Sequence, residues 1–139
     1  MTPFFSRTVR IEWGQCDPAG IVYAPRFLDI CGENTILLFE AAGLPRKRDM
    51  LAGMNVAGFP MVALTTRFLA TCTYGDAVVV ETAAPAFGNS SFVVEHRIAL
   101  AGRTCVECRE TRVWTVPAPD RPGGLRAERV PDRVRALFA

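Results

Sequence analysis

The feature that most constrains the fold of this chain is a single change in the spacing of its apolar residues. Over residues 25–42 the apolar positions recur every three or four residues, which predicts one amphipathic helix of about 18 residues. Pro25 suits the first helical turn, and Gly43 followed by Pro45 is a stop signal. Elsewhere the apolar residues alternate with polar ones, as they do in β-strands. One long helix among strands must bury its apolar stripe on the only sheet available.

Five segments carry the strand-like alternation, at residues 4–13, 61–72, 77–87, 91–101 and 104–116. The last four are separated only by the turn sequences TYGD, GNS and AGR, so these strands are expected to pair antiparallel. We therefore predict an α+β fold, a five-stranded antiparallel sheet wrapped around one helix, as a single domain spanning residues 1–139. The uncovered sheet face and edges favour a homo-oligomer, a dimer or larger.

Charge and hydropathy exclude two classes of partner. The net charge is +2, and the arginines are spread from Arg7 to Arg135 instead of forming the clustered basic face that nucleic-acid binding requires. No apolar run approaches the roughly 18 residues that cross a bilayer, and the N-terminus lacks the layout of a signal peptide. We expect no nucleic acid, no membrane and a cytoplasmic location.

The cysteines are odd in number and scattered, which argues against a disulfide framework and fits a reducing compartment. Cys105 and Cys108 form a CxxC inside a strand-like run, where a spacing of three is expected to send the two side chains to opposite faces. With His96 as the single histidine, no metal site is expected, and His96 itself is expected to be structural. The five cysteines are Cys16, Cys31, Cys72, Cys105 and Cys108.

The stretch QCDPAGIVYAPRF, residues 15–27, places Asp17 in a loop that leads directly into the predicted helix. The first turn of a helix has backbone N–H groups without internal partners and a partial positive charge, so it can stabilise a developing oxyanion. Pro25 has no N–H. The candidate donors are therefore Ala24 or its neighbours Tyr23 and Arg26.

Asp17 has two interpretations at this level. A carboxylate held beside an electrophilic carbonyl can attack it directly or take a proton from water, which supports acyl transfer to water. Gly20 would let the loop close and Pro18 would stiffen it. Asp17 could equally be an ordinary turn residue, because Asp-Pro favours turn initiation.

The segment IEWGQCDPAGIVYAPRF resembles the start of the hotdog-fold acyl-CoA thioesterases, in the branch of the bacterial 4-hydroxybenzoyl-CoA thioesterases. The similarity continues through GLP at Gly43, GFPMV at Gly58, TYGDAVVVET at Thr73 and SFVVEHRI at Ser91, and weakens after Val116. It implies a hotdog fold, thioester hydrolysis, and a tetramer built from dimers with active sites between two subunits. It implies no metal or redox cofactor, since coenzyme A is part of the substrate.

The resemblance also implies roles for particular residues. Asp17 matches the catalytic carboxylate, and the backbone N–H of Ala24 matches the oxyanion donor. The acyl pocket is expected at Gly20, Tyr23, Phe27 and Phe59. Coenzyme A is expected at Asn89, Ser90 and Ser91.

Two departures from the family concern the substrate. A basic run near the coenzyme A phosphates is replaced here by the sequence GNS at residues 88–90, so phosphate contacts would come from backbone N–H groups or from arginines such as Arg67 or Arg97. Phe59 stands where the aromatic thioesterase has a small hydroxyl residue, and its bulk would change the acid accepted if it lines the pocket.

Two alternatives stay open from the sequence. A hotdog hydratase or dehydratase acting on acyl thioesters usually needs a histidine beside a carboxylate, and the only histidine, His96, lies in a late strand. A non-catalytic acyl-CoA-binding protein would bind the esters tightly without turnover.

Overall fold

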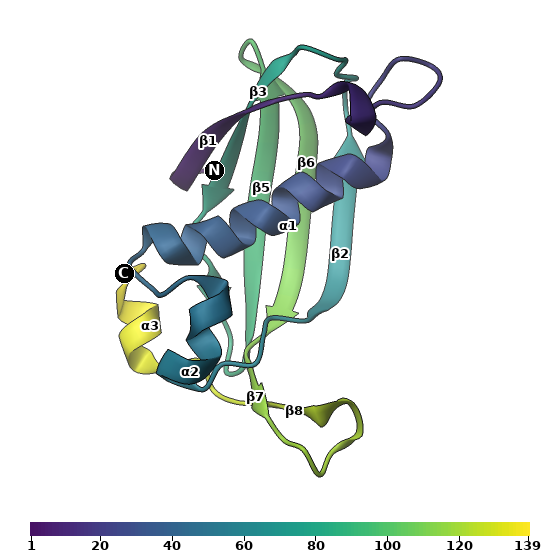
Figure 1. Cartoon of the computed structure of the whole chain (residues 1–139). Helices are drawn as coiled ribbons and strands as arrows, with labels where there is room; N and C mark the ends of the chain where they lie inside the picture. The colour runs from purple at the N-terminus through teal and green to yellow at the C-terminus, as the bar shows by residue number, and fades with distance from the viewer.

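The computed structural model describes residues 1–139. One long helix, α1 (Ala24–Ala41), crosses one face of an antiparallel sheet (Figure 1). We call the face that α1 covers the inner face and the opposite one the outer face. The strand order is β1-β3-β5-β6-β2, and β4 pairs with β5 beside this path. The strands are β1 (Pro3–Arg10), β2 (Met61–Phe68), β3 (Ala77–Ala83), β4 (Ala86–Phe87), β5 (Ser91–Leu100) and β6 (Arg103–Val113).

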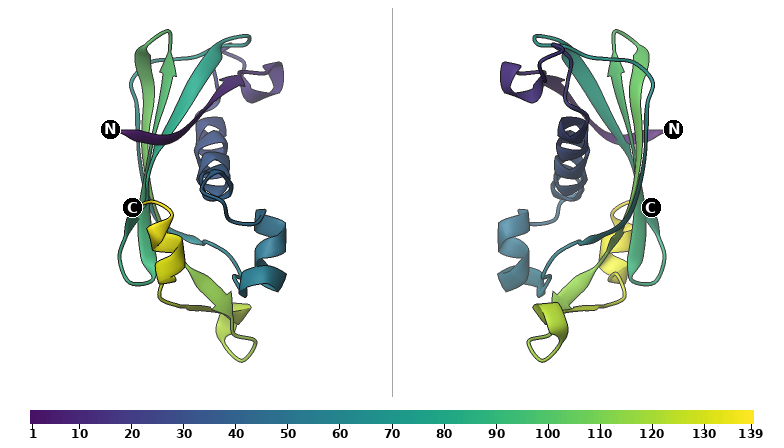
Figure 2. Two further views of the ribbon diagram at one scale, coloured as in Figure 1. Left: turned by 90° about the vertical axis from the view of Figure 1, so that its left-hand side faces the viewer. Right: turned by 90° about the vertical axis from the view of Figure 1, so that its right-hand side faces the viewer.

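The smaller elements gather mainly at one end of the sheet, away from the loop that precedes α1 (Figure 2). They are the helices α2 (Met50–Met54) and α3 (Asp132–Ala136), the strand pair β7 (Thr115–Pro117) and β8 (Leu125–Ala127), and the 3-10 turns η2 (Lys47–Asp49) and η3 (Pro122–Gly124). The turn η1 (Trp13–Gln15) lies at the opposite end. The sequence pattern did not predict α2, because five residues are too few to show a helical period.

The predicted helix and its antiparallel sheet are confirmed, with one difference in strand count. The segment predicted as a single strand over residues 77–87 is divided into β3 and β4, so the sheet has six strands instead of five. Pro85 lies at the break, and proline has no N–H to donate to a strand ladder. The segment at residues 104–116 is likewise divided into β6 and β7.

The CxxC cysteines do not lie on opposite faces, so that expectation is wrong. Both Cys105 and Cys108 are buried in the same apolar cluster under α1. The pairing of β5 with β6 shifts between Ile98 and Ala99 and leaves Cys105 as an extra residue in β6. Such a bulge interrupts the strict alternation of side chains. All five cysteines are free thiols.

The core has two parts along α1. The part near the start of the helix is aliphatic and includes four of the cysteines, and the part near its end is rich in aromatic rings. Asn34 of α1 is fully buried and donates to Thr82 Oγ1 at 2.6 Å. None of the helices has both the length and the apolar character needed to cross a membrane.

The edge strand β2 exposes much of its apolar surface. Its partner within the chain is β6, and its other side is unpaired. Large apolar side chains of β2 are 39 to 62% exposed, namely Met61, Val62, Leu64 and Phe68. An unpaired apolar edge of this kind is a template for pairing with another strand.

Candidate active site

The loop before α1 is closed by its own backbone. Asp17 N–H donates to Ile21 O at 2.9 Å, and Gly20 N–H donates to Asp17 O at 2.9 Å. Gly20 has φ +82°, in the left-handed region that glycine adopts without steric cost. Thr73 Oγ1 also donates to Gly20 O at 2.6 Å, which ties the loop to the segment before β3. Asp17 is therefore held at the base of a well-supported turn.

The two carboxylate oxygens of Asp17 have different surroundings. Oδ1 accepts a hydrogen bond from Ala19 N–H at 2.9 Å, whereas Oδ2 has no protein partner and no cation pairs with the group. The side chain lines a cavity of about 270 Å³ together with Gly14, Cys16, Pro18, Tyr23 and Arg26. The turn role and a chemical role are thus compatible, because one oxygen stabilises the turn and the other remains free.

The structure distinguishes the three candidate donors at the helix start. Tyr23 N–H donates to Gln15 O at 2.8 Å, and Arg26 N–H donates to Tyr23 O at 2.8 Å. Ala24 is the first residue of α1, and its N–H has no protein acceptor. Of these three N–H groups only that of Ala24 is left without an acceptor in the chain.

The remaining residues near the loop form its apolar surroundings. Tyr23 is 52% exposed beside the cavity, whereas Phe27 is buried one turn into α1. The Phe27 ring lies 6.3 Å from the Phe68 ring at the end of β2. The start of α1 thus contacts the end of β2, while the cavity itself is lined by the loop and by Tyr23 and Arg26.

Other predicted site residues lie at the far end of α1 in the same chain. Phe59 is buried, with ring centroids 5.0 to 5.6 Å from three core aromatic rings, those of Phe39, Phe92 and Trp114. An 18-residue helix is about 27 Å long, so Phe59 does not lie beside Asp17 within one chain.

The residues predicted to bind coenzyme A lie at the turn between β4 and β5, next to Phe92, whose ring is 5.6 Å from that of Phe59. They are Asn89, Ser90 and Ser91. Two carbonyl groups of this turn are already occupied, since Asn89 O accepts from Val130 N–H at 2.9 Å and Ser90 O from Trp114 N–H at 2.8 Å. The structure does not bring this turn next to Asp17 within one chain.

Arg67 and Arg97 line a larger cavity, of about 420 Å³, on the outer face of the sheet. There Arg67 lies 3.6 Å from Glu107, and Arg97 lies 3.0 Å from Glu81. We place the candidate site at the smaller cavity because it combines a free carboxylate oxygen with an open helix N-terminus.

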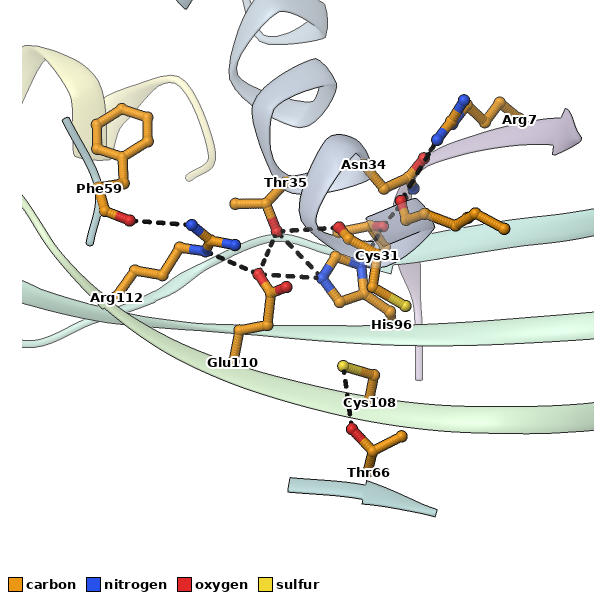
Figure 3. A network of polar contacts seen from close by, with 12 residues as sticks. Arg7, Cys31, Asn34, Thr35, Phe59, Thr66, His96, Cys108, Glu110 and Arg112 are labelled. Carbon is orange, nitrogen blue, oxygen red and sulfur yellow. Dashed lines mark hydrogen bonds and ion pairs between the residues drawn. The ribbon is translucent and has the colours of Figure 1, made fainter. Parts of the chain in front are cut away.

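A buried polar network between α1 and the sheet was not predicted from the sequence (Figure 3). Thr35 Oγ1 donates to Glu110 Oε1 at 2.7 Å, and His96 Nε2 lies 3.1 Å from the same Thr35 oxygen. Because the one Thr35 proton is given to Glu110, the His96 Nε2–H must donate to Thr35. Nδ1 of the same ring lies 2.8 Å from Thr82 Oγ1.

Glu110 is the buried charge of this network. Burial alone would raise the pKa of Glu110, but the interactions with His96, Arg112 and Thr35 outweigh it and lower the pKa from 4.5 to about 2. Arg112 Nε donates to Glu110 Oε1 at 2.9 Å, and Arg112 Nη1 donates to Phe59 O at 2.9 Å. Strand alternation could have revealed the network, because Glu110 shares the inward parity of Val106 and Cys108.

The network places a histidine beside a carboxylate, the pair that hydratase chemistry would need. A substrate could not reach this pair, however, because it is buried. His96 Nε2 lies 3.6 Å from Glu110 Oε1, and both side chains are at most 1% exposed beneath α1. A substrate cannot contact this pair without displacing the helix.

Comparison with known proteins adds an independent observation. Residues 11–138 match the family described as the thioesterase-like superfamily. The 4-hydroxybenzoyl-CoA thioesterase of Pseudomonas sp. strain CBS-3 is 33% identical over 130 residues, which cover 88% of each chain. The 1,4-dihydroxy-2-naphthoyl-CoA hydrolase of Nostoc punctiforme is 30% identical over 97 residues, 70% of this chain and 63% of that protein. The solved structure of the Pseudomonas thioesterase superposes with a TM-score of 0.87 and 28% identity, covering 98% of this chain and 99% of that one.

Proposed function

The chain belongs to the thioesterase-like superfamily, and from this membership we propose that it is a hotdog-fold acyl-CoA thioesterase. It hydrolyses an aromatic or short-chain acyl-CoA to the free acid and coenzyme A. The observation that carries the proposal is the pairing of two unoccupied groups at one loop, the free carboxylate oxygen of Asp17 and the free N–H of Ala24. The relatives reported above act on thioesters of hydroxylated aromatic acids, which supports an aromatic acyl group.

In this mechanism the thioester carbonyl oxygen accepts a hydrogen bond from Ala24 N–H at the positive end of α1. Asp17 then acts by one of two routes. Its carboxylate attacks the carbonyl carbon, expels the coenzyme A thiolate and forms a mixed anhydride that water hydrolyses. Alternatively it removes a proton from a water molecule that attacks the carbonyl itself. The thiolate leaves in both routes.

A single turnover in labelled water separates these routes. A trapped acyl anhydride on Asp17 would establish direct attack. Label that enters only the product acid, and never the protein, would count against it.

The proposed site is completed by a second copy of the chain. Two β2 strands pairing across a two-fold axis run antiparallel and join two sheets at their exposed apolar edges. This arrangement places the start of each β2 beside the end of the other. The far end of one copy, which carries Phe59 and the turn at residues 88–91, thereby approaches the Asp17 end of the other. We propose a homodimer of this kind, or a tetramer built from two.

The proposed chemistry needs no metal or redox cofactor, since a carboxylate and a backbone N–H supply it and coenzyme A arrives with the substrate. Five free cysteines, four of them buried, fit the reducing conditions of the cytoplasm.

Free-thiol release from a panel of coenzyme A esters tests the proposal, with benzoyl, hydroxybenzoyl, phenylacetyl and short aliphatic acyl groups. We expect at least one ester to be hydrolysed and its turnover to fall by orders of magnitude in Asp17→Asn. Asp120→Asn, in an exposed loop, serves as the matched control. Tight ester binding without turnover, unchanged in Asp17→Asn, would favour a non-catalytic acyl-CoA-binding protein instead.

A further inference from the structure

Positive charge is concentrated at the end of the molecule that holds α2, α3 and the β7–β8 pair (Figure 2). The two segments that build this end, residues 44–60 and 114–139, contain eight Lys or Arg and four Asp or Glu, a net charge of +4. The remaining residues contain eight and ten, a net charge of −2. We call this part of the molecule the basic end, and its field attracts anions.

Arg135 of α3 holds the turn between β4 and β5 at the basic end. Its Nη2 donates to Gly88 O at 2.5 Å and to Asn89 O at 2.8 Å. Its Nε donates to Val130 O at 2.9 Å, and the guanidinium lies 5.4 Å from the centre of the Phe87 ring. No carboxylate pairs with Arg135, so its charge is not neutralised within the chain.

The backbone of this turn is polarised. Besides the bonds from Arg135, Asn89 O accepts Val130 N–H at 2.9 Å, and Ser90 O accepts Trp114 N–H at 2.8 Å. The N–H groups of Asn89 and Ser90 have no acceptor in the chain. The carbonyl groups are thus bound by the protein while two successive N–H groups stay free, and successive free N–H groups in a turn form a concavity that binds anions.

The turn has no charged side chain of its own, and the C-terminal segment supplies the charge beside it. Gly88 cannot be replaced freely, because a Cβ there would lie 2.8 Å from Ser91 Oγ. Arg129 Nη1 donates to Asn89 Oδ1 at 3.4 Å, and its Nη2 donates to Asp132 Oδ1 at 3.1 Å. Two guanidinium groups and one carboxylate therefore surround the turn.

We propose that this turn, together with Arg129 and Arg135, binds a phosphate group of the coenzyme A nucleotide. The inference rests on the proposed function and identifies the C-terminal segment as part of its substrate site. A phosphate would accept the N–H groups of Asn89 and Ser90 and pair with Arg135 Nη1, which has no acceptor in the chain. Arg135 is also a positioning residue, because its other donors hold the carbonyl groups and leave the N–H groups free.

Two features of the whole molecule agree with this placement. Arg67 and Arg97, the other candidate cations, already lie beside Glu107 and Glu81 on the outer face. In the proposed dimer the basic end of one copy approaches the Asp17 loop of the other. The nucleotide would then lie on one subunit while the thioester reaches the other.

The test measures binding of free coenzyme A, so that it does not depend on turnover. Isothermal titration gives the Kd for wild type, Arg129→Gln and Arg135→Gln. We expect each variant to bind about tenfold more weakly, as for the loss of a hydrogen bond to a charged group. Arg121→Gln is the matched control, since Arg121 is exposed, has no ion pair and lies in the β7–β8 loop, and it should change the Kd by less than about twofold.

Two further measurements separate a phosphate contact from a purely structural role. Raising the salt concentration should weaken wild-type binding more than binding by the double variant Arg129→Gln/Arg135→Gln, because salt screens a charge contact. Asn89→Pro removes one of the free N–H groups without changing charge and should also weaken binding. Proline suits this place, because neither Asn89 nor Ser90 has a positive φ. Thermal unfolding verifies that each variant is folded.

Dephospho-coenzyme A, which lacks the 3′-phosphate, identifies the phosphate that is bound. Variants that bind it as wild type does would assign the site to the 3′-phosphate, and variants that lose affinity for it as well would assign the site to the diphosphate. Unchanged coenzyme A affinity in folded Arg129→Gln and Arg135→Gln would overturn the proposal, as would an equal loss in Arg121→Gln. The expected losses in a protein that hydrolyses no ester would contradict the proposed hydrolysis and support the phosphate site.

Discussion

Asp17 divides its two carboxylate oxygens between the turn and the cavity. Oδ1 accepts Ala19 N–H and stabilises the loop, while Oδ2 stays free. The backbone N–H groups at the helix start are likewise of two kinds. Those of Tyr23 and Arg26 donate to carbonyl groups of the chain, whereas that of Ala24 has no acceptor. At the scale of residues, the proposed chemistry therefore depends on two small groups that the local backbone leaves unpaired.

Ala24→Pro removes the proposed oxyanion donor and little else. Proline suits the first helical position, and the preceding Tyr23 already has the extended conformation (φ −67°, ψ 121°) that a following proline requires. We expect kcat to fall by about 100- to 1000-fold, the usual cost of losing one oxyanion donor, with little change in Tm. Ala24→Ser retains the N–H and should remain active. An unchanged kcat in a folded Ala24→Pro protein would remove Ala24 from the mechanism.

Cys16 should be the most reactive cysteine of the native protein. It is partly exposed and lines the same cavity as Asp17, whereas the other four cysteines are buried. Titration with an aromatic disulfide reagent should find one fast thiol, absent in Cys16→Ser, and a bound non-hydrolysable acyl-CoA analogue should slow its reaction. Fast reaction that the analogue does not affect would argue that the substrate occupies another place.

At the scale of elements, α1 is joined to the sheet by a polar network as well as by apolar contacts. Thr35 on the helix contacts His96 on β5 and Glu110 on β6, and the absence of a side chain at Gly32 gives room for Arg112. Glycine inside a helix costs about 1 kcal/mol relative to alanine. The close approach of Arg112 provides the structural reason for accepting that cost.

Glu110 should make the stability of the protein sensitive to acid. Its pKa is lowered from 4.5 to about 2 in the folded state, so its contribution is present above pH 4.5 and is lost as the pH falls toward 2. The shift corresponds to about 3 kcal/mol of unfolding free energy. Urea unfolding of wild type between pH 5 and pH 2 should show this loss, and Glu110→Gln should be less stable at pH 7 with a weaker pH dependence. Parallel curves for the two proteins would refute the assignment.

At the scale of the whole molecule, one chain does not bring the predicted site together. Asp17 and Ala24 lie at the start of α1, whereas Phe59 packs on Phe39 near the end of that helix and on Phe92, next to the turn at residues 88–91. Antiparallel pairing of two β2 strands brings opposite ends of two copies toward each other. Oligomerisation would therefore determine which side chains face the acyl group.

Leu64→Lys should disrupt this dimer. Leu64 lies near the middle of β2, so a two-fold axis through the strand pair would bring two lysines close together, and charged residues on an edge oppose strand pairing. Light scattering after size-exclusion chromatography should show a monomer with reduced thioesterase activity. Thr8→Lys, on the opposite edge strand β1, should leave the oligomeric state unchanged. A dimer that persists in Leu64→Lys would place the interface elsewhere.

Local sequence patterns were sufficient to predict the helix, the antiparallel sheet and the loop that contains Asp17. The helix was predicted because its apolar residues repeat with one period over many turns, and the loop because proline and glycine constrain the backbone of their immediate neighbours. The division of the strand at Pro85 and the bulge at Cys105 were missed. The first depends on which N–H groups a neighbouring strand needs, and the second on the register between β5 and β6.

The sequence by itself determined the one-helix α+β architecture and the presence of a carboxylate and an N–H donor around the start of that helix, because both follow from contacts within a few turns of chain. Only the tertiary structure decided that Phe59 is a core residue, that Ala24 is the free donor, and that Arg112 meets Gly32. Thr35 and Glu110 are separated by 75 positions in the chain, and no periodic pattern encodes which residues at such separations will share a hydrogen bond. Those contacts are selected when the sheet closes on the helix and each buried polar group must find a partner.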